Sequence, residues 1–185
     1  MRSPADKAVS ERLWVQIPPS ALCDSMEEFE VNRNVEIGLH NVSEIFKGLD
    51  NVEVLKKVFN GSEMLKQVIA NLSVRITNQH GYMWIDEENG YICISFDYLA
   101  NADERYIYLD VVHELVHIKQ RLDGRKLFDR SYSYVERPTE VEAYKITVEE
   151  AKRIGMRENE ILFYLSVEWV DHEDRIKLLK TLGLV

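Results

Sequence analysis

Two histidines, His113 and His117, stand four residues apart, and Glu114 directly follows the first of them. Residues 101–124 around them carry apolar side chains at helical spacing, which predicts a helix. One helical turn then places both imidazoles on the same face, where they can bind one metal ion. Glu114 lies about a third of a turn away, where its carboxylate can accept a proton from a water on that metal. The pattern indicates metal-assisted hydrolysis.

Two histidines alone make a weak site, because a catalytic zinc usually has three protein ligands and leaves the fourth position to water. Two acidic residues after Pro138, Glu140 and Glu142, are the candidates for the third ligand. Acidic side chains in the first turn of a helix also favour the helix dipole without any metal. No third histidine follows His117 at the spacing of three-histidine sites, so a carboxylate is expected to complete the site.

These motifs resemble those of the zincin peptidases, and among them the gluzincins, whose third ligand is a glutamate on a later helix. The sequence Glu-Val-Glu-Ala at residues 140–143 also matches the Glu-x-x-Ala motif of small ImmA/IrrE-type domains. The resemblance implies one zinc ion, bound by His113, His117 and Glu140, with Glu114 as the general base of peptide hydrolysis.

The likeness leaves the third ligand between two residues. Glu140 fits the Glu-x-x-Ala motif and is preferred, whereas Glu142, directly before Ala143, would be the ligand in a thermolysin-like arrangement. Tyr144 departs from the pattern, because those families often have Asp or Asn at this position.

Hydrolysis of an amide also needs a hydrogen-bond donor for the oxyanion that develops on the carbonyl. The candidates are Tyr132 and Tyr134, in a polar loop over residues 125–137, and Tyr144 in the following helix. Asp110, on the same helix face as the histidines, is expected to orient one of them.

The helix that carries the histidines is predicted to begin with Asn101 as its N-cap and Glu104 in a capping box, and to end at Gly124. One face is expected to pack in the core, and the histidine face is expected to border a cleft. The expected core residues are Tyr108, Val111, Leu115, Ile118 and Leu122.

A small antiparallel sheet is predicted before this helix. Residues 82–96 alternate with a period of two around Asn89-Gly90, which is typical of a two-residue hairpin turn. That turn places Ile85 opposite Ile94 and Met83 opposite Phe96.

One further strand is predicted, and the second strand of the hairpin has an expected role. Residues 74–77 add a third strand to the hairpin. By the zincin resemblance, residues 91–98 would form the strand that lines the cleft and pairs with the substrate backbone.

The remaining elements are helical. Residues 41–72 form an N-terminal helical layer in which Ser62 caps the last helix. A helix from Pro138 to about Gly155 and two shorter ones over 158–170 and 172–182 complete the chain. The predicted fold is α+β and zincin-like, with one domain over residues 26–185 after a loose extension at 1–25.

The composition limits the classes of partner. A formal net charge of -9 disfavours nucleic acid, and no apolar run is long enough to span a membrane. Cys23 and Cys93 are too far apart in sequence to suggest a disulfide framework or a thiolate metal site. We therefore expect a cytoplasmic protein.

The predicted function is zinc-dependent hydrolysis of a peptide or protein substrate. Two alternatives remain, a non-proteolytic metal-binding module of the regulatory or toxin-antitoxin kind that has a protein partner, and hydrolysis of a non-peptide amide. The presence of Glu114 favours chemistry, because a purely structural metal site does not need that carboxylate.

Overall fold

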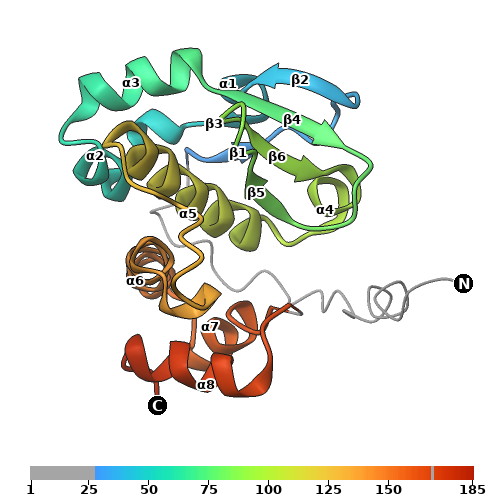
Figure 1. Cartoon of the computed structure of the whole chain (residues 1–185). Helices are drawn as coiled ribbons and strands as arrows, with labels where there is room; N and C mark the ends of the chain where they lie inside the picture. The colour runs from blue at the N-terminus through green and yellow to red at the C-terminus, as the bar shows by residue number, and fades with distance from the viewer. Residues whose placement is uncertain (1–27, 168) are drawn as a thin grey trace, which may run out of the picture.

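The computed structural model describes residues 28–167 and 169–185. Helices and a small sheet make up an α+β fold, as predicted (Figure 1). The extension predicted at residues 1–25, with Cys23, lies outside the described residues. Within the described part, no helix is both long and apolar enough to cross a lipid bilayer.

The main sheet has four strands in the order β2, β4, β6, β5. They are β2 (Gly38–Asn41), β4 (Ser73–Thr77), β6 (Ile92–Ser95) and β5 (Met83–Ile85). The two outer pairs are antiparallel, but β4 and β6 are parallel, so the prediction of an antiparallel sheet is wrong for the central pair. After β4 the chain forms β5 at the edge of the sheet and then β6 between β4 and β5. The alternation of side chains within single strands does not reveal this order. Two short strands, β1 (Glu30–Val31) and β3 (Phe46–Lys47), form a separate pair.

The predicted hairpin exists, but its register differs by two residues. Met83 pairs with Ile94, and Ile85 pairs with Ile92, rather than with Phe96 and Ile94. A shift of two residues keeps each side chain on its original face. The apolar face predicted for the hairpin is therefore buried all the same.

The register differs because the turn is longer than two residues. The backbone N–H of Asp86 donates to the carbonyl of Tyr91 at 2.9 Å, so the loop comprises residues 87–90. The carboxylate of Asp86 accepts from the backbone N–H of Asn89 at 2.8 Å, and this local bond competes with the tighter turn.

The N-terminal helical layer consists of three helices and one 3-10 turn. They are α1 (Val42–Ile45), η3 (Leu49–Asn51), α2 (Glu53–Val58) and α3 (Ser62–Asn71). Gly61 occupies the N-cap of α3 with φ +133°, a conformation that favours glycine, so the cap predicted at Ser62 is wrong by one residue.

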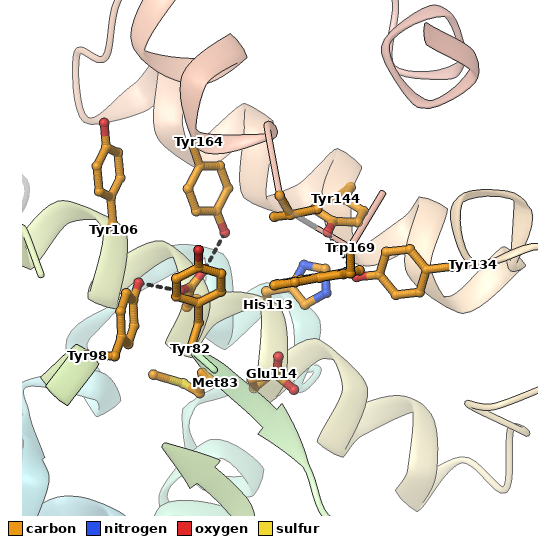
Figure 2. A pocket seen from close by; sticks show the side chains of 12 residues that line it. Tyr82, Met83, Tyr98, Tyr106, His113, Glu114, Tyr134, Tyr144, Tyr164 and Trp169 are labelled. Carbon is orange, nitrogen blue, oxygen red and sulfur yellow. Dashed lines mark hydrogen bonds between the residues drawn. The ribbon is translucent and has the colours of Figure 1, made fainter. Parts of the chain in front are cut away.

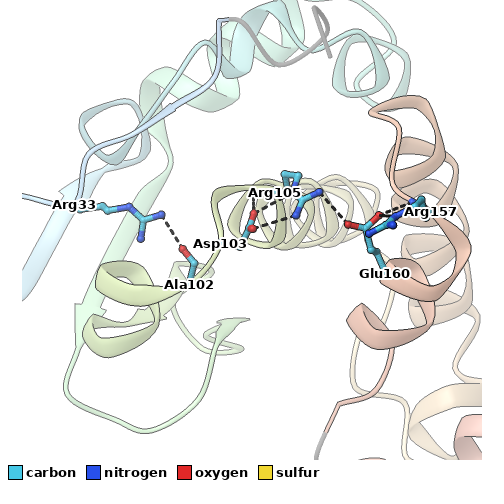
Figure 3. A network of polar contacts seen from close by, with 6 residues as sticks. All are labelled: Arg33, Ala102, Asp103, Arg105, Arg157 and Glu160. Atoms are coloured by element: carbon cyan, nitrogen blue, oxygen red, sulfur yellow. Dashed lines mark hydrogen bonds and ion pairs between the residues drawn. The ribbon is translucent and has the colours of Figure 1, made fainter. Parts of the chain in front are cut away.

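The predicted start of the histidine helix is also wrong. Asn101 ends a separate helix, α4 (Phe96–Asn101), and the long helix α5 (Glu104–Leu122) begins after Asp103. The carboxylate of Asp103 accepts from the backbone N–H of Arg105 at 2.9 Å, which makes it the N-cap. Arg33 donates to the carbonyl of Ala102 at 2.8 Å and holds the extended residue between the two helices (Figure 3).

Helix α5 is the central element of the fold. It lies between the sheet and the C-terminal helices (Figure 1), and it contacts both β5 and α6. Those C-terminal helices are α6 (Pro138–Arg153), α7 (Glu158–Tyr164), shorter than predicted, and α8 (His172–Thr181).

Burial on almost every side of α5 corrects the expectation of one core face and one open face. The predicted core residues are buried except Leu122, which is 57% exposed at the last turn. His113 and His117 are buried against α6 and are each only 6% exposed.

Candidate metal centre

Three buried side chains from α5 and α6 converge on one point. The Nε2 atoms of His113 and His117 lie 3.0 Å apart. Oε2 of Glu140, in the first turn of α6, lies 3.4 Å from each of them. These three residues form the one group of histidine, cysteine and acidic side chains in the described part of the chain whose spacing suits a metal ion.

The triangle of donor atoms fits a small divalent cation. Zinc bonds of about 2.0–2.1 Å in tetrahedral geometry require ligand atoms that are about 3.3–3.4 Å apart, close to the separations observed. Oε2 of Glu140 is buried and makes no hydrogen bond to any described residue. A buried carboxylate oxygen without a donor is costly in a folded protein, and a bound cation would satisfy it.

Gln120, one turn after His117 on α5, fixes the tautomer of that histidine. Its Nε2 donates to the carbonyl of Thr139 at 3.0 Å and to Oε2 of Glu142 at 2.9 Å. Its Oε1 therefore faces His117 and accepts from Nδ1–H at 2.8 Å. When the ring is neutral, as a metal ligand must be, the proton on Nδ1 leaves the lone pair of Nε2 directed toward the other two donor atoms.

Glu142 is not part of the triangle, which corrects its place among the candidate ligands. Its carboxylate accepts hydrogen bonds from Arg125 and Gln120, and its side chain is 47% exposed. Glu140, two residues earlier on α6, occupies the position nearest the histidines. Of the two predicted alternatives, the geometry selects Glu140.

The structure places two of the three candidate tyrosines beside the metal-binding group and the third away from it. Tyr132 is 47% exposed and does not line the site, so its predicted role is wrong. The hydroxyls of Tyr134 and Tyr144 lie 3.0 Å apart, and the ring of Tyr144 packs edge-on against His113 at 4.6 Å between centroids. Tyr134 and Tyr144 are therefore the available donors beside the metal-binding candidates.

Asp110 does not orient a histidine, contrary to the prediction. Its two carboxylate oxygens accept hydrogen bonds from Tyr98 and, at 2.8 Å, from Tyr164. Nδ1 of His113 has no hydrogen-bond partner among the described residues. Of the two histidines, only His117 has a polar partner that fixes its ring, and that partner is Gln120.

Burial and charge shift the pKa values of the site in opposite directions. Burial raises the pKa of Glu114 to about 8, and the negative charges of Glu140 and Asp110 add to the effect. Burial lowers the pKa of His113. Burial also opposes the charged form of His117, but the neighbouring carboxylates of Glu140 and Glu114 outweigh it and raise the pKa to about 9. The two imidazoles hold the pKa of Glu140 well below its usual range, against the effect of burial.

A cavity adjoins the triangle along α5 (Figure 2). His113 and Glu114 form part of its wall, so both side chains are accessible from the cavity. Its volume is about 60 Å³, which is enough for ordered water. The other described lining residues are Tyr82, Met83, Tyr98, Tyr106, Asp110, Tyr134, Tyr144, Tyr164, Val167 and Trp169.

The strand beside the cavity is β5, whereas the predicted segment 91–98 reaches the cavity through Tyr98 of α4 and not through β6. β6 is paired on both sides, and residues 96–98 belong to α4, so this segment offers no free edge. Within the described residues, β5 pairs with β6 alone and forms an edge of the sheet. Met83, the first residue of β5, and Tyr82 directly before it line the cavity.

Some functional candidates were not predicted from the sequence. Gln120 carries a usable signal, because it stands three residues after His117 and therefore shares its helix face. Tyr164 and Trp169 carry none, because they reach the cavity only through the packing of the C-terminal helices (Figure 2).

Comparisons of the chain with protein-family models, with curated proteins and with solved structures found no match.

Proposed function

We propose that this chain is a zinc metallopeptidase of the zincin, gluzincin-like kind, acting on a peptide or protein substrate. The observation that carries the proposal is the buried triangle of His113, His117 and Glu140, with Glu114 beside it on the cavity wall. Two imidazoles and one carboxylate are a ligand set typical of catalytic zinc, and a bound cation would displace the proton that His117 holds without it. When bound, zinc supplies an acidified water and polarises the carbonyl to be attacked.

The protein's own residues have distinct tasks in this proposal. Glu114 accepts the proton from the attacking water and returns it to the leaving amine, a task for which its place on the cavity wall beside His113 is suited. Tyr134 and Tyr144 keep their phenolic protons, because burial raises the pKa of both hydroxyls. One of the two hydroxyls donates to the other, so the accepting hydroxyl keeps a proton that it can donate to the oxyanion.

A second candidate function is a non-proteolytic, metal-binding regulatory module. The small volume of the cavity, about 60 Å³, favours it, because pockets that bind ligands usually measure roughly 300–1,000 Å³. Under the first proposal, substrate entry requires the aromatic residues at the cavity wall to move apart.

Zinc analysis combined with a Glu114→Gln variant tests the proposal. Protein purified without chelator should contain about one zinc per chain. The variant should retain that zinc and lose hydrolysis of a fluorogenic peptide library. Glu88→Gln makes the same chemical change at an exposed loop position and should keep both properties.

The outcomes separate the two candidates. Protein without zinc would refute both of them. Zinc without hydrolysis in the native chain would favour the regulatory module. Hydrolysis retained by Glu114→Gln would refute the role of Glu114 as base.

A further inference from the structure

The end of the cavity nearest the start of α5 consists of aromatic rings around one carboxylate. Asp110 stands three residues before His113, so both lie on the same face of α5, one turn apart. The hydroxyls of Tyr98 and Tyr164 donate to this carboxylate, and Figure 2 shows these two rings with Tyr82 and Trp169 on the wall of the same cavity. The rings concerned are those of Tyr82, Tyr98, Tyr106, Tyr164 and Trp169.

These rings contact one another and form continuous walls. Tyr82 packs edge-on against Tyr98 at 5.2 Å between ring centroids and lies 5.4 Å from Trp169. Tyr106 stacks on Tyr164 at 5.9 Å. The walls therefore come from segments far apart in the sequence, namely β5, α4, α5, α7 and the segment before α8.

The charge of this region is negative. Asp110 accepts hydrogen bonds from the hydroxyls of Tyr98 and Tyr164, which stabilise its carboxylate form. None of the described lining residues is a lysine or an arginine. A cation that enters would approach Asp110 and meet aromatic faces, which attract cations through their quadrupoles. An anionic side chain would be repelled, and a purely apolar one would gain nothing from the carboxylate.

The chemistry of the region favours one kind of side chain. A flexible aliphatic chain that ends in an amine would lay its methylene groups against the rings and bring its charge to Asp110. From the ring geometry and the charge, we propose that the region around Asp110 is a subsite for a lysine side chain of the substrate. This inference rests on the proposed peptidase function, because a peptide cleaved at the metal centre would place a neighbouring side chain here.

Binding of a matched pair of small probes tests the subsite without any need for hydrolysis. The probes are Nα-acetyl-lysine methylamide and its norleucine analogue, which lacks only the charged amine. Protein-observed NMR of the zinc-loaded chain should show the lysine probe shifting the indole signal of Trp169, with a Kd about 10-fold lower than that of norleucine. Equal affinities would overturn the inference.

Variants assign the preference to this region. Asp110→Asn should remove the lysine preference, whereas Asp123→Asn, which loses the same charge at an exposed position after α5, should keep it. If Asp110→Asn does not fold, Trp169→Ala provides the second test, because Trp169 is 55% exposed and its loss spares the core. That variant should raise the Kd of the lysine probe about 3- to 10-fold, measured by calorimetry because the variant lacks the indole signal. An unchanged Kd would contradict the subsite.

Kinetics on paired peptides separate this inference from the proposed function. Peptides with lysine at one position should be cleaved with a kcat/KM about 10- to 100-fold above that of their norleucine counterparts, and Asp110→Asn should abolish this ratio. Cleavage without a lysine preference would refute the subsite and leave the peptidase proposal intact. Lysine-selective binding with no cleavage of any peptide would refute the peptidase and leave the subsite.

Discussion

Nδ1–H of His117 donates a 2.8 Å hydrogen bond to Oε1 of Gln120. The amide cannot turn over without losing its bonds to Thr139 and Glu142, so Nδ1 keeps its proton and Nε2 is the nitrogen left for a metal. Because Gln120 is itself buried, this arrangement exists before any ion arrives. We therefore expect Gln120, an uncharged side chain, to increase the affinity of the site for a metal ion.

Replacing Gln120 by leucine should therefore weaken zinc binding about 10- to 100-fold, the usual effect of losing a hydrogen bond that orients a ligand. Competition with a chromophoric chelator measures the affinity. Gln67→Leu, an equivalent change on the exposed face of α3, should leave it unaltered. Equal affinities for native protein and Gln120→Leu would mean that packing alone orients the ring.

Alanine at Glu140 should lower zinc affinity far more than alanine at Glu142. The first change removes an oxygen 3.4 Å from both imidazoles, and the second removes only a partner of Gln120 and Arg125. We expect Glu140→Ala to lose stoichiometric zinc and Glu142→Ala to retain it, as measured by metal analysis after dialysis. The opposite order would reassign the third ligand.

Phenylalanine at Tyr144 or Tyr134 should lower kcat about 10- to 100-fold, because each change removes a donor placed for the oxyanion. Zinc content should not change. Tyr132→Phe is the matched control, since this ring is exposed and lies outside the cavity, and it should behave like the native chain. A similar loss in all three variants would argue against a specific role.

The buried carboxylate of Glu160 should make the free energy of unfolding depend on pH in the acid range. Its hydrogen bonds with Arg157, and the charge of Arg105, outweigh its burial and lower its pKa (Figure 3). A lowered pKa stabilises the folded state above the unfolded value of about 4.3, and this contribution is lost as the pH falls through the folded value.

Glu160→Gln should accordingly reduce the free energy of unfolding at pH 7 by about 1–2 kcal/mol and flatten its decline below about pH 5. Urea unfolding at a series of pH values measures both effects. Glu158→Gln, at an exposed position of the same helix, should follow the native curve. If the free energy of unfolding changes with pH in parallel for Glu160→Gln and the native chain, ionisation of Glu160 does not contribute to the loss of stability in acid.

The metal-binding candidates were predictable because their spacing is local. His113 and His117 depend on one helical turn, and Glu140 follows a proline that marks the start of α6. The choice between Glu140 and Glu142 was not decided by spacing, because both belong to the first turns of that helix. Only the contact between α5 and α6 distinguishes them.

The parts that failed depend on contacts between distant segments. The alternation of residues 82–96 identified two strands, but it contains no information on which neighbour β4 would take. Asp110 appeared to be a partner for histidine because it shares their helix face. Its actual partners, Tyr98 and Tyr164, come from α4 and α7, and no local pattern connects them with it.

The three metal-binding candidates also join two separate parts of the fold. His113 and His117 belong to a helix that packs against the sheet, and Glu140 belongs to the first of the C-terminal helices. An ion held by all three would act as a cross-link that closes the chain between residues 117 and 140. Because the unfolded chain does not hold these three ligands together, the binding free energy of the ion adds to the stability of the loaded protein. Chelation should therefore increase hydrogen exchange first in α6, α7 and α8, while the strands beneath α5 stay protected.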